Sequence, residues 1–179
     1  EKREVLLREG IRWTADGDHW PPGMGFDHDP SVTGESIRKW AEALAARPAR
    51  AGFAPRDTAL FAIADEPAWG YPKRFRIIRE TPAVLDRFRE YLRAQGLTPP
   101  DVGEERWEDV FPIGRSRVRD LPSRRLFYWS VRFPPWDSAR HYARCTRALE
   151  EAFYPGLPVY ANWAHPNGRF YIPGAFGGN

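Results

Sequence analysis

The chain has 179 residues, of which 42% are hydrophobic, and this content excludes wholesale disorder. The net charge of +3 comes from 27 basic and 24 acidic residues that are intermixed along the chain, whereas a nucleic-acid interface normally shows clustered Lys and Arg. A single cysteine, Cys145, excludes an internal disulfide and a cysteine-based metal site. No run of 18 apolar residues and no signal peptide occurs, so no membrane span is predicted. Because the first residue is Glu1, we expect a processed or truncated chain.

Apolar periodicity and boundary residues predict several helices. Helices are expected over residues 1–12, 34–46, 81–96, 101–110, 122–133 and 136–153. Pro48 is expected to end the second of these, and Pro134 and Pro135 to separate the last two. Thr81 is placed as an N-cap and Gly96 as a C-terminal stop. For 122–133 the pattern also leaves a strand open.

Two short apolar runs, 59–64 and 158–162, predict strands, and the first reads as a strand covered on both faces. Residues 14–34, rich in Gly, Pro and Asp, are expected to form a loop. The order of helices and strands is the βα rhythm of a parallel sheet, so the two strands should be parallel neighbours. The helix over 136–153 should cover the outer face of the sheet through Tyr142, Cys145, Leu149 and Phe153.

Two strands are too few for a complete sheet in a chain of this length. The sequence therefore predicts an α/β fold that is a fragment of a (β/α)8 TIM-type barrel with helical insertions. In this interpretation residues 1–179 form a single partial barrel domain.

Two carboxylates, Asp65 and Glu66, directly follow the first strand, where α/β sheets and barrels bind ligands. Because side chains alternate along a strand, Glu66 is expected to share a face with Ala62 and Ala64 and to point into the barrel mouth. The structural alternative is that Asp65 caps a turn and that Glu66 forms a surface ion pair with an arginine.

Aromatic and polar side chains near the two strand ends extend this candidate site. Trp69 and Tyr71 follow the carboxylates and suit a concave site. Asn162, Trp163 and His165 follow the second strand, where they are either sugar contacts or a turn followed by core.

Four stretches, ADEPAW, FREYLRAQG, SARHYARCTRALEEAFYPG and LPVYANW, together resemble the middle third of a glycoside hydrolase catalytic barrel, over roughly residues 36–165. In the large retaining clan of these enzymes the fourth strand ends in Asn-Glu, where the Glu is the general acid/base, and a second Glu on the seventh strand is the nucleophile. Asp65 replaces that Asn here. An adjacent Asp-Glu pair is instead similar to β-N-acetylhexosaminidases that use substrate-assisted catalysis.

The resemblance implies hydrolysis of glycosidic bonds in an oligosaccharide or polysaccharide, with Glu66 protonating the leaving oxygen. In the substrate-assisted scheme Asp65 orients the acetamido group, and in the retaining scheme the nucleophile lies beyond Asn179. The apolar strand, Trp69 and the charge of Asp65 are expected to raise the pKa of Glu66, as a general acid requires. The resemblance alone implies a secreted or periplasmic protein. The alternative from another class is a non-catalytic carbohydrate-binding or scaffold protein on the same barrel.

The sequence gives less support to a metal site, to a hydrolase with a serine nucleophile and to a phosphate-binding loop. The spacing of carboxylates and imidazoles in 26–30, with His19 nearby, matches no familiar metal site, and such residues usually make turns. The sequence contains no nucleophile elbow and no phosphate-cradling glycine loop. We therefore expect no metal, no cofactor and no nucleic-acid partner.

Overall fold

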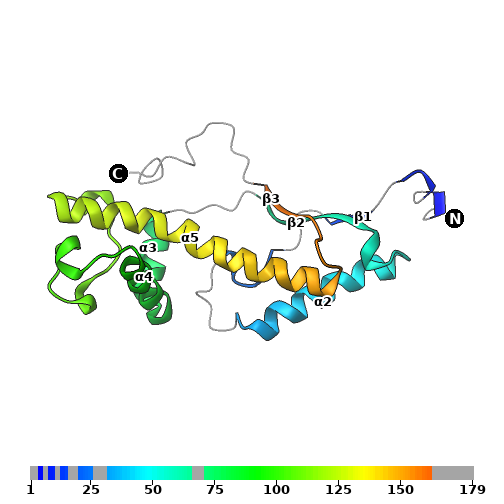
Figure 1. The fold of residues 1–179 in the computed structure, drawn as a ribbon, viewed down its shortest axis with the longest axis horizontal. Helices are drawn as coiled ribbons and strands as arrows, with labels where there is room; N and C mark the ends of the chain where they lie inside the picture. Colours follow the sequence, from blue (N-terminus) through cyan, green and yellow to red (C-terminus); the bar gives the residue numbers. More distant parts are fainter. Residues whose placement is uncertain are drawn as a thin grey trace. The chain divides into compact units, whose positions relative to one another are not determined.

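The computed structural model describes residues 4–5, 8–10, 13–15, 20–25, 32–65 and 71–162. The chain divides into two compact units, which are considered separately: Glu1–Pro67 with Ala139–Ala164, and Ala68–Ser138 with His165–Asn179. The helix α5 (Leu121–Ala152) contributes its first part to the second unit and its last part to the first (Figure 1).

The first unit contains a parallel sheet in the order β1 (Trp13–Ala15), β2 (Thr58–Asp65), β3 (Val159–Asn162). The two predicted strands and their parallel pairing are confirmed. The strand β1 was not predicted, because three residues are too few to show alternation; its last two residues lie in the stretch expected to be a loop. Two short 3-10 turns, η1 (Pro22–Gly25) and η2 (Pro55–Asp57), precede α2 and β2 respectively.

Helix α2 (Gly34–Arg50) and the last part of α5 pack on one face of this sheet (Figure 1). The ring of Phe61, in the central strand, meets the rings of Trp40 and Phe153 edge-on, with centroid distances of 6.3 and 5.8 Å. The predicted covering residues of α5 are all buried in the same cluster, which confirms the role expected of this helix: Tyr142, Cys145, Leu149 and Phe153.

The strand β2 does not keep strict alternation. Its register against β3 shifts between Ala62 and Ala64, as at a β-bulge. Ile63 and Ala64, although consecutive, both belong to the cluster that contacts the helices. The expectation that Ala62 and Ala64 share a face is therefore wrong, and the side assigned to Glu66 loses its basis.

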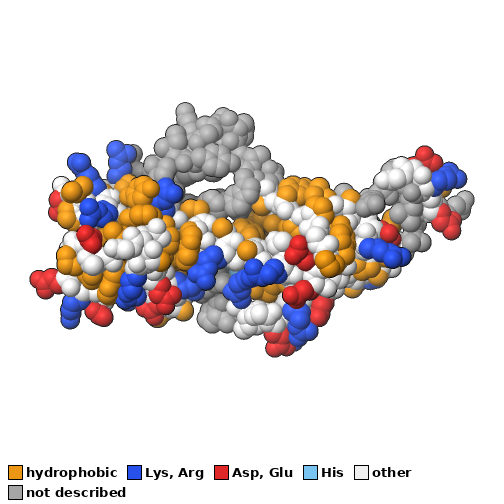
Figure 2. All heavy atoms as spheres, in the orientation of Figure 1, with side chains coloured by type: hydrophobic (Ala, Val, Ile, Leu, Met, Phe, Trp, Pro, Cys, Tyr) orange, Lys and Arg blue, Asp and Glu red, His pale blue; other side chains and the backbone are white. Residues whose placement is uncertain are grey.

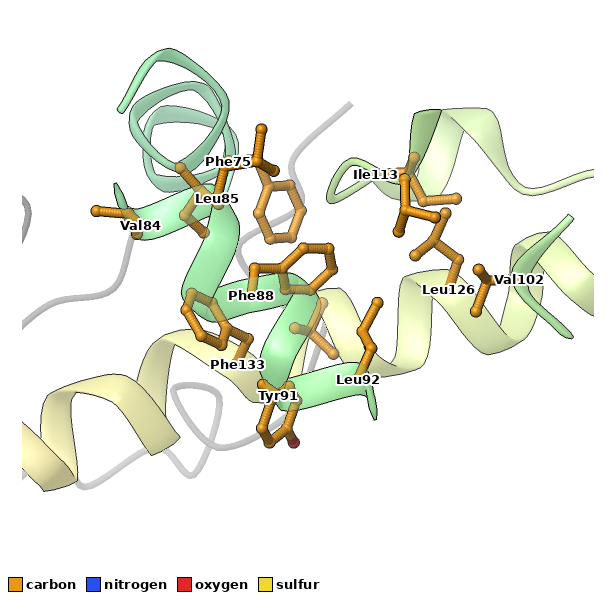
Figure 3. Close-up of a cluster of buried hydrophobic side chains, with 13 residues drawn as sticks. Phe75, Val84, Leu85, Phe88, Tyr91, Leu92, Val102, Ile113, Leu126 and Phe133 are labelled. Carbon is orange, nitrogen blue, oxygen red and sulfur yellow. The ribbon is translucent and has the colours of Figure 1, made fainter. Parts of the chain in front are cut away.

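The second unit is built from α3 (Tyr71–Glu80), α4 (Pro82–Ala94) and the first part of α5. Between α4 and α5 the chain makes three short 3-10 turns, η3 (Pro99–Val102), η4 (Trp107–Asp109) and η5 (Arg115–Arg117). The helix expected over 101–110 is therefore wrong, and α3 was not predicted. Thirteen buried side chains from these elements form one cluster, with Phe88 against Phe133 at a centroid distance of 5.3 Å (Figure 3).

The predicted fragment of a (β/α)8 barrel is wrong. The described residues are mostly helical and contain three strands in one small sheet. The reason lies between β2 and β3: apolar residues there bury one another in the separate helical cluster of the second unit and add no strand to the described sheet.

Two of the expected helix breaks are also wrong. Helix α2 continues through Pro48 to Arg50, and α5 continues through Pro134 and Pro135. An interior proline costs about 3 kcal/mol of helix stability. Pro48 and Pro134 are buried, so tertiary packing outweighs that cost at these positions. The other predicted helices agree with the structure over 122–133 and at α4, which follows Thr81 and ends before Gly96. Of the helix expected over 1–12, residues 4–5 and 8–10 are described: 4, 5 and 8 are helical, whereas 9 and 10 form a turn.

Candidate functional site

The carboxyl ends of β2 and β3 meet at one edge of the sheet. The register pairs Asp65, the last residue of β2, with Asn162, the last residue of β3. Neighbouring strands lie about 4.8 Å apart, so the backbones of these two residues are side by side. Two strand ends that sequence reasoning chose separately are thus brought together.

Two hydrogen bonds near the beginning of the strands support this register. The Tyr154 hydroxyl donates a hydrogen bond to the carbonyl oxygen of Thr58 at 2.7 Å. The backbone N–H of Phe61 donates to the carbonyl of Pro158 at 2.9 Å. These bonds attach the turn before β3 to β2, and the strands then run in parallel to the Asp65–Asn162 pair.

The other predicted site residues are only partly within the described chain. Glu66, Trp69, Trp163 and His165 lie outside the described residues, as do 26–30 and His19. Tyr71 is the first residue of α3, in the second unit, and is described through its backbone. The raised pKa of Glu66 and the sugar contacts stay predictions.

Sequence reasoning missed a buried imidazole on α5. His141 is 1% exposed, and its Nε2 lies 3.6 Å from the Sγ of Cys145. It belongs to the part of α5 that lies in the first unit. A sequence signal existed: positions 141, 142 and 145 share the helix face expected to be buried.

Candidate metal sites and candidate membrane-spanning helices were sought among the described residues. Within 4–5, 8–10, 13–15, 20–25, 32–65 and 71–162 no group of three or more His, Cys, Asp or Glu is placed to hold a metal ion. No helix in the same part of the chain combines the length and apolar character needed to cross a membrane. Figure 2 shows acidic and basic side chains interspersed over the visible face.

Comparison of the chain with models of protein families, with curated proteins and with solved structures finds no match in any of the three. A functional assignment therefore depends on the residues and their geometry.

Proposed function

We propose that the protein hydrolyses glycosidic bonds of an oligosaccharide or polysaccharide bound at the carboxyl edge of β2 and β3, with Glu66 as general acid/base. The pairing of Asp65 with Asn162 carries this proposal. It supports a site there because the candidate carboxylates and the candidate sugar contacts come from strand ends that share one edge, which is where open α/β sheets bind ligands.

The chemistry asks for a proton at the leaving oxygen as the glycosidic bond breaks. A carboxylic acid supplies it only when its pKa is raised toward the working pH. Glu66 directly follows a strand whose residues Phe61 to Ala64 are at most 3% exposed, and a neighbouring apolar core favours a protonated carboxyl group. Asp65, one residue earlier, adds a negative charge with the same effect on the pKa.

Asp65 has a second role in the substrate-assisted scheme. There the acetamido oxygen of the substrate attacks the anomeric carbon, Asp65 orients the acetamido group, and Glu66 protonates the departing oxygen. Asn162 would donate or accept hydrogen bonds with sugar hydroxyls, and Trp163 would stack on a sugar ring.

The decisive test is Glu66→Gln, which keeps the size of the side chain and removes the transferable proton. Turnover of a natural glycoside with an unactivated leaving group should fall by roughly 10²–10⁴, as for loss of one general acid/base. Aryl glycosides should lose less in the bond-breaking step, because an aryl oxide departs without the proton. Glu80→Gln, at an exposed carboxylate of α3 that pairs with Arg76, is the matched control and should leave turnover unchanged.

Full activity of the Glu66→Gln protein on such a glycoside would remove Glu66 from the mechanism. Sugar binding by the wild-type protein without any hydrolysis would instead support a non-catalytic carbohydrate-binding protein.

Asp65→Asn separates the two catalytic schemes. A loss of turnover confined to 2-acetamido sugars supports substrate assistance. A mild loss on all sugars supports a nucleophilic carboxylate elsewhere in the protein, about 5–5.5 Å from the carboxyl group of Glu66.

A further inference from the structure

The first part of α5 exposes basic and apolar side chains along one line. Leu121, Arg124, Tyr128 and Arg132 are spaced by three, four and four residues, which places them on one face of the helix. All four are exposed, Leu121 to 67% and Tyr128 to 48%. We call these four residues the α5 stripe.

The aromatic ring of the α5 stripe is held in place by its neighbours. The ring of Trp129 meets the Tyr128 ring edge-on, at a centroid distance of 4.9 Å and an interplanar angle of 83°. The guanidinium of Arg132 lies over the same ring, 5.1 Å from its centroid. Burial raises the pKa of the Tyr91 phenol, and the charge of Arg132 and its hydrogen bond to that phenol act in the opposite direction. Ring and cation are therefore positioned before any ligand arrives, which lowers the entropy cost of binding.

The arginines of the α5 stripe carry charge that no carboxylate of the same helix neutralises. The single acidic residue of α5 before Glu150 is Asp137, which is 4% exposed and paired with Arg87. Among the described residues, neither Arg124 nor Arg132 forms an ion pair.

Arg125, the residue after Arg124 in the sequence, does form an ion pair, with Asp101 at 3.1 Å. Of the three arginines in the first part of α5, Arg124 and Arg132 are therefore the two without an ion pair among the described residues.

We propose that the α5 stripe binds an anionic polysaccharide, with a sugar ring stacked on Tyr128 and its carboxylate or sulfate groups bound by Arg124 and Arg132. The apolar face of a pyranose ring packs on an aromatic ring, and the planar guanidinium matches the geometry of carboxylates and other oxyanions. The inference rests on the proposed function, since it names the acidic class of glycan that the protein would bind.

A nucleic acid is the weaker match. A specific nucleic-acid interface neutralises several phosphates and covers about 1,000–2,500 Å². The α5 stripe offers two arginines and one exposed ring along about 16 Å of helix.

The test measures binding of the full chain to alginate, a polyuronate, by affinity electrophoresis and titration calorimetry. Dextran, a neutral polymer, and single-stranded DNA serve as comparison probes. Wild-type protein should bind alginate, more weakly at higher salt, and should not bind dextran. Tyr128→Ala and Arg132→Gln should each weaken alginate binding by roughly three- to tenfold, because each removes one stacking or cationic contact.

Two matched variants keep the result interpretable. Tyr128→Phe keeps the ring and should keep the affinity. Arg76→Gln removes an exposed arginine of α3 that pairs with Glu80, and it should have no effect. Unchanged thermal midpoints would show that the variants remain folded.

Absence of alginate binding, or binding that is indifferent to Tyr128 and Arg132, overturns the inference. Single-stranded DNA that competes with alginate and loses affinity in the same variants would make the α5 stripe a nucleic-acid surface, which overturns it too. Alginate binding without hydrolysis of any glycoside would refute the proposed function and leave this inference standing.

Discussion

The buried Asp137 and the partly buried Arg87 form a two-point ion pair in the second unit. Their Nε–Oδ1 and Nη2–Oδ2 distances are 3.0 and 3.2 Å, and the side chains are 4% and 24% exposed. Such a pair adds little relative to apolar residues, but breaking it leaves a charge in an apolar environment.

Asp137→Ala should therefore lower the free energy of unfolding by about 1–3 kcal/mol, because the partly buried Arg87 guanidinium then loses its carboxylate. Urea denaturation measures the loss. Glu80→Ala, which breaks an exposed pair with Arg76, is the control and should change stability by less than about 1 kcal/mol.

The combination of Arg87→Met with Asp137→Leu tests the cause. It should recover most of the lost stability, since no unpaired charge remains. A double variant as unstable as Asp137→Ala would show that the pair itself stabilises the unit.

Asp120 links the stability of α5 to pH. Its carboxylate accepts hydrogen bonds from the hydroxyl and the backbone N–H of Ser123, at 2.6 and 2.9 Å, and these bonds hold the pKa of Asp120 below its ordinary value of 3.8. A pKa depressed in the folded state gives stability that is present above the unfolded value and is lost as pH falls through the folded value.

The thermal midpoint should therefore drop as the pH is lowered from 5 through about 3.8 and below, and Ser123→Ala should reduce the part of this drop that comes from Asp120. Scanning calorimetry across this pH range measures both. Identical acid profiles for the two proteins would contradict the assignment of the shift to Ser123.

At the scale of elements, helices α2 and α4 each follow a threonine at the N-cap position, and only one of the two side chains makes a capping hydrogen bond. Thr33, before α2, forms a capping box: its Oγ1 accepts from Ser36 N–H at 3.1 Å, and Ser36 Oγ accepts from Thr33 N–H at 2.9 Å. Thr81, before α4, makes no such side-chain bond.

Thr33→Ala should therefore destabilise the protein by about 1 kcal/mol, and Thr81→Ala by less than about 0.5 kcal/mol. The two variants remove the same atoms from the same kind of position, so each is the control of the other. Equal losses in urea denaturation would mean that the capping hydrogen bond does not cause the difference.

The elements that could be predicted are those whose local pattern agrees with their burial. The run 59–64 and helix α4 carry both an apolar pattern and boundary residues, and both agree with the structure. The helix break expected at Pro48 was wrong because the tertiary packing of this proline outweighs its tendency to end a helix. That packing cannot be read from the sequence. The short strand β1 has too few residues to show a period. Helix α3 was overlooked although Tyr71, Phe75 and Ile78 have helical spacing.

The candidate site was predictable in part. The approach of the two strand ends followed from the βα order and is confirmed by the Asp65–Asn162 pairing. The shift at Ile63 was not predictable, because a bulge depends on how two strands fit together and leaves no mark in one of them. His141 was overlooked since a histidine on a buried helix face looks like any other core residue until its depth is known.

At the scale of the whole molecule, each compact unit has a buried cluster of its own. Phe88 is fully buried in the cluster of the second unit, and Leu149 is fully buried in the cluster of the first. Helix α5 contributes residues to both clusters. We therefore expect a destabilising substitution in one cluster to increase local unfolding mainly within the unit that contains it.

Phe88→Ala should cost about 3–5 kcal/mol and Leu149→Ala about 2–5 kcal/mol, because each leaves a cavity in a closely packed cluster. Amide hydrogen exchange, followed by mass spectrometry of peptides, measures where protection is lost. Phe88→Ala should speed exchange in α3 and α4 more than in β2, and Leu149→Ala should do the reverse. Tyr160→Ala, at a side chain that is 43% exposed, is the control and should leave exchange in both units close to that of the wild-type protein. Equal acceleration in both units by either core variant would show that the two clusters unfold as one cooperative structure, and the division into units would then have no energetic meaning.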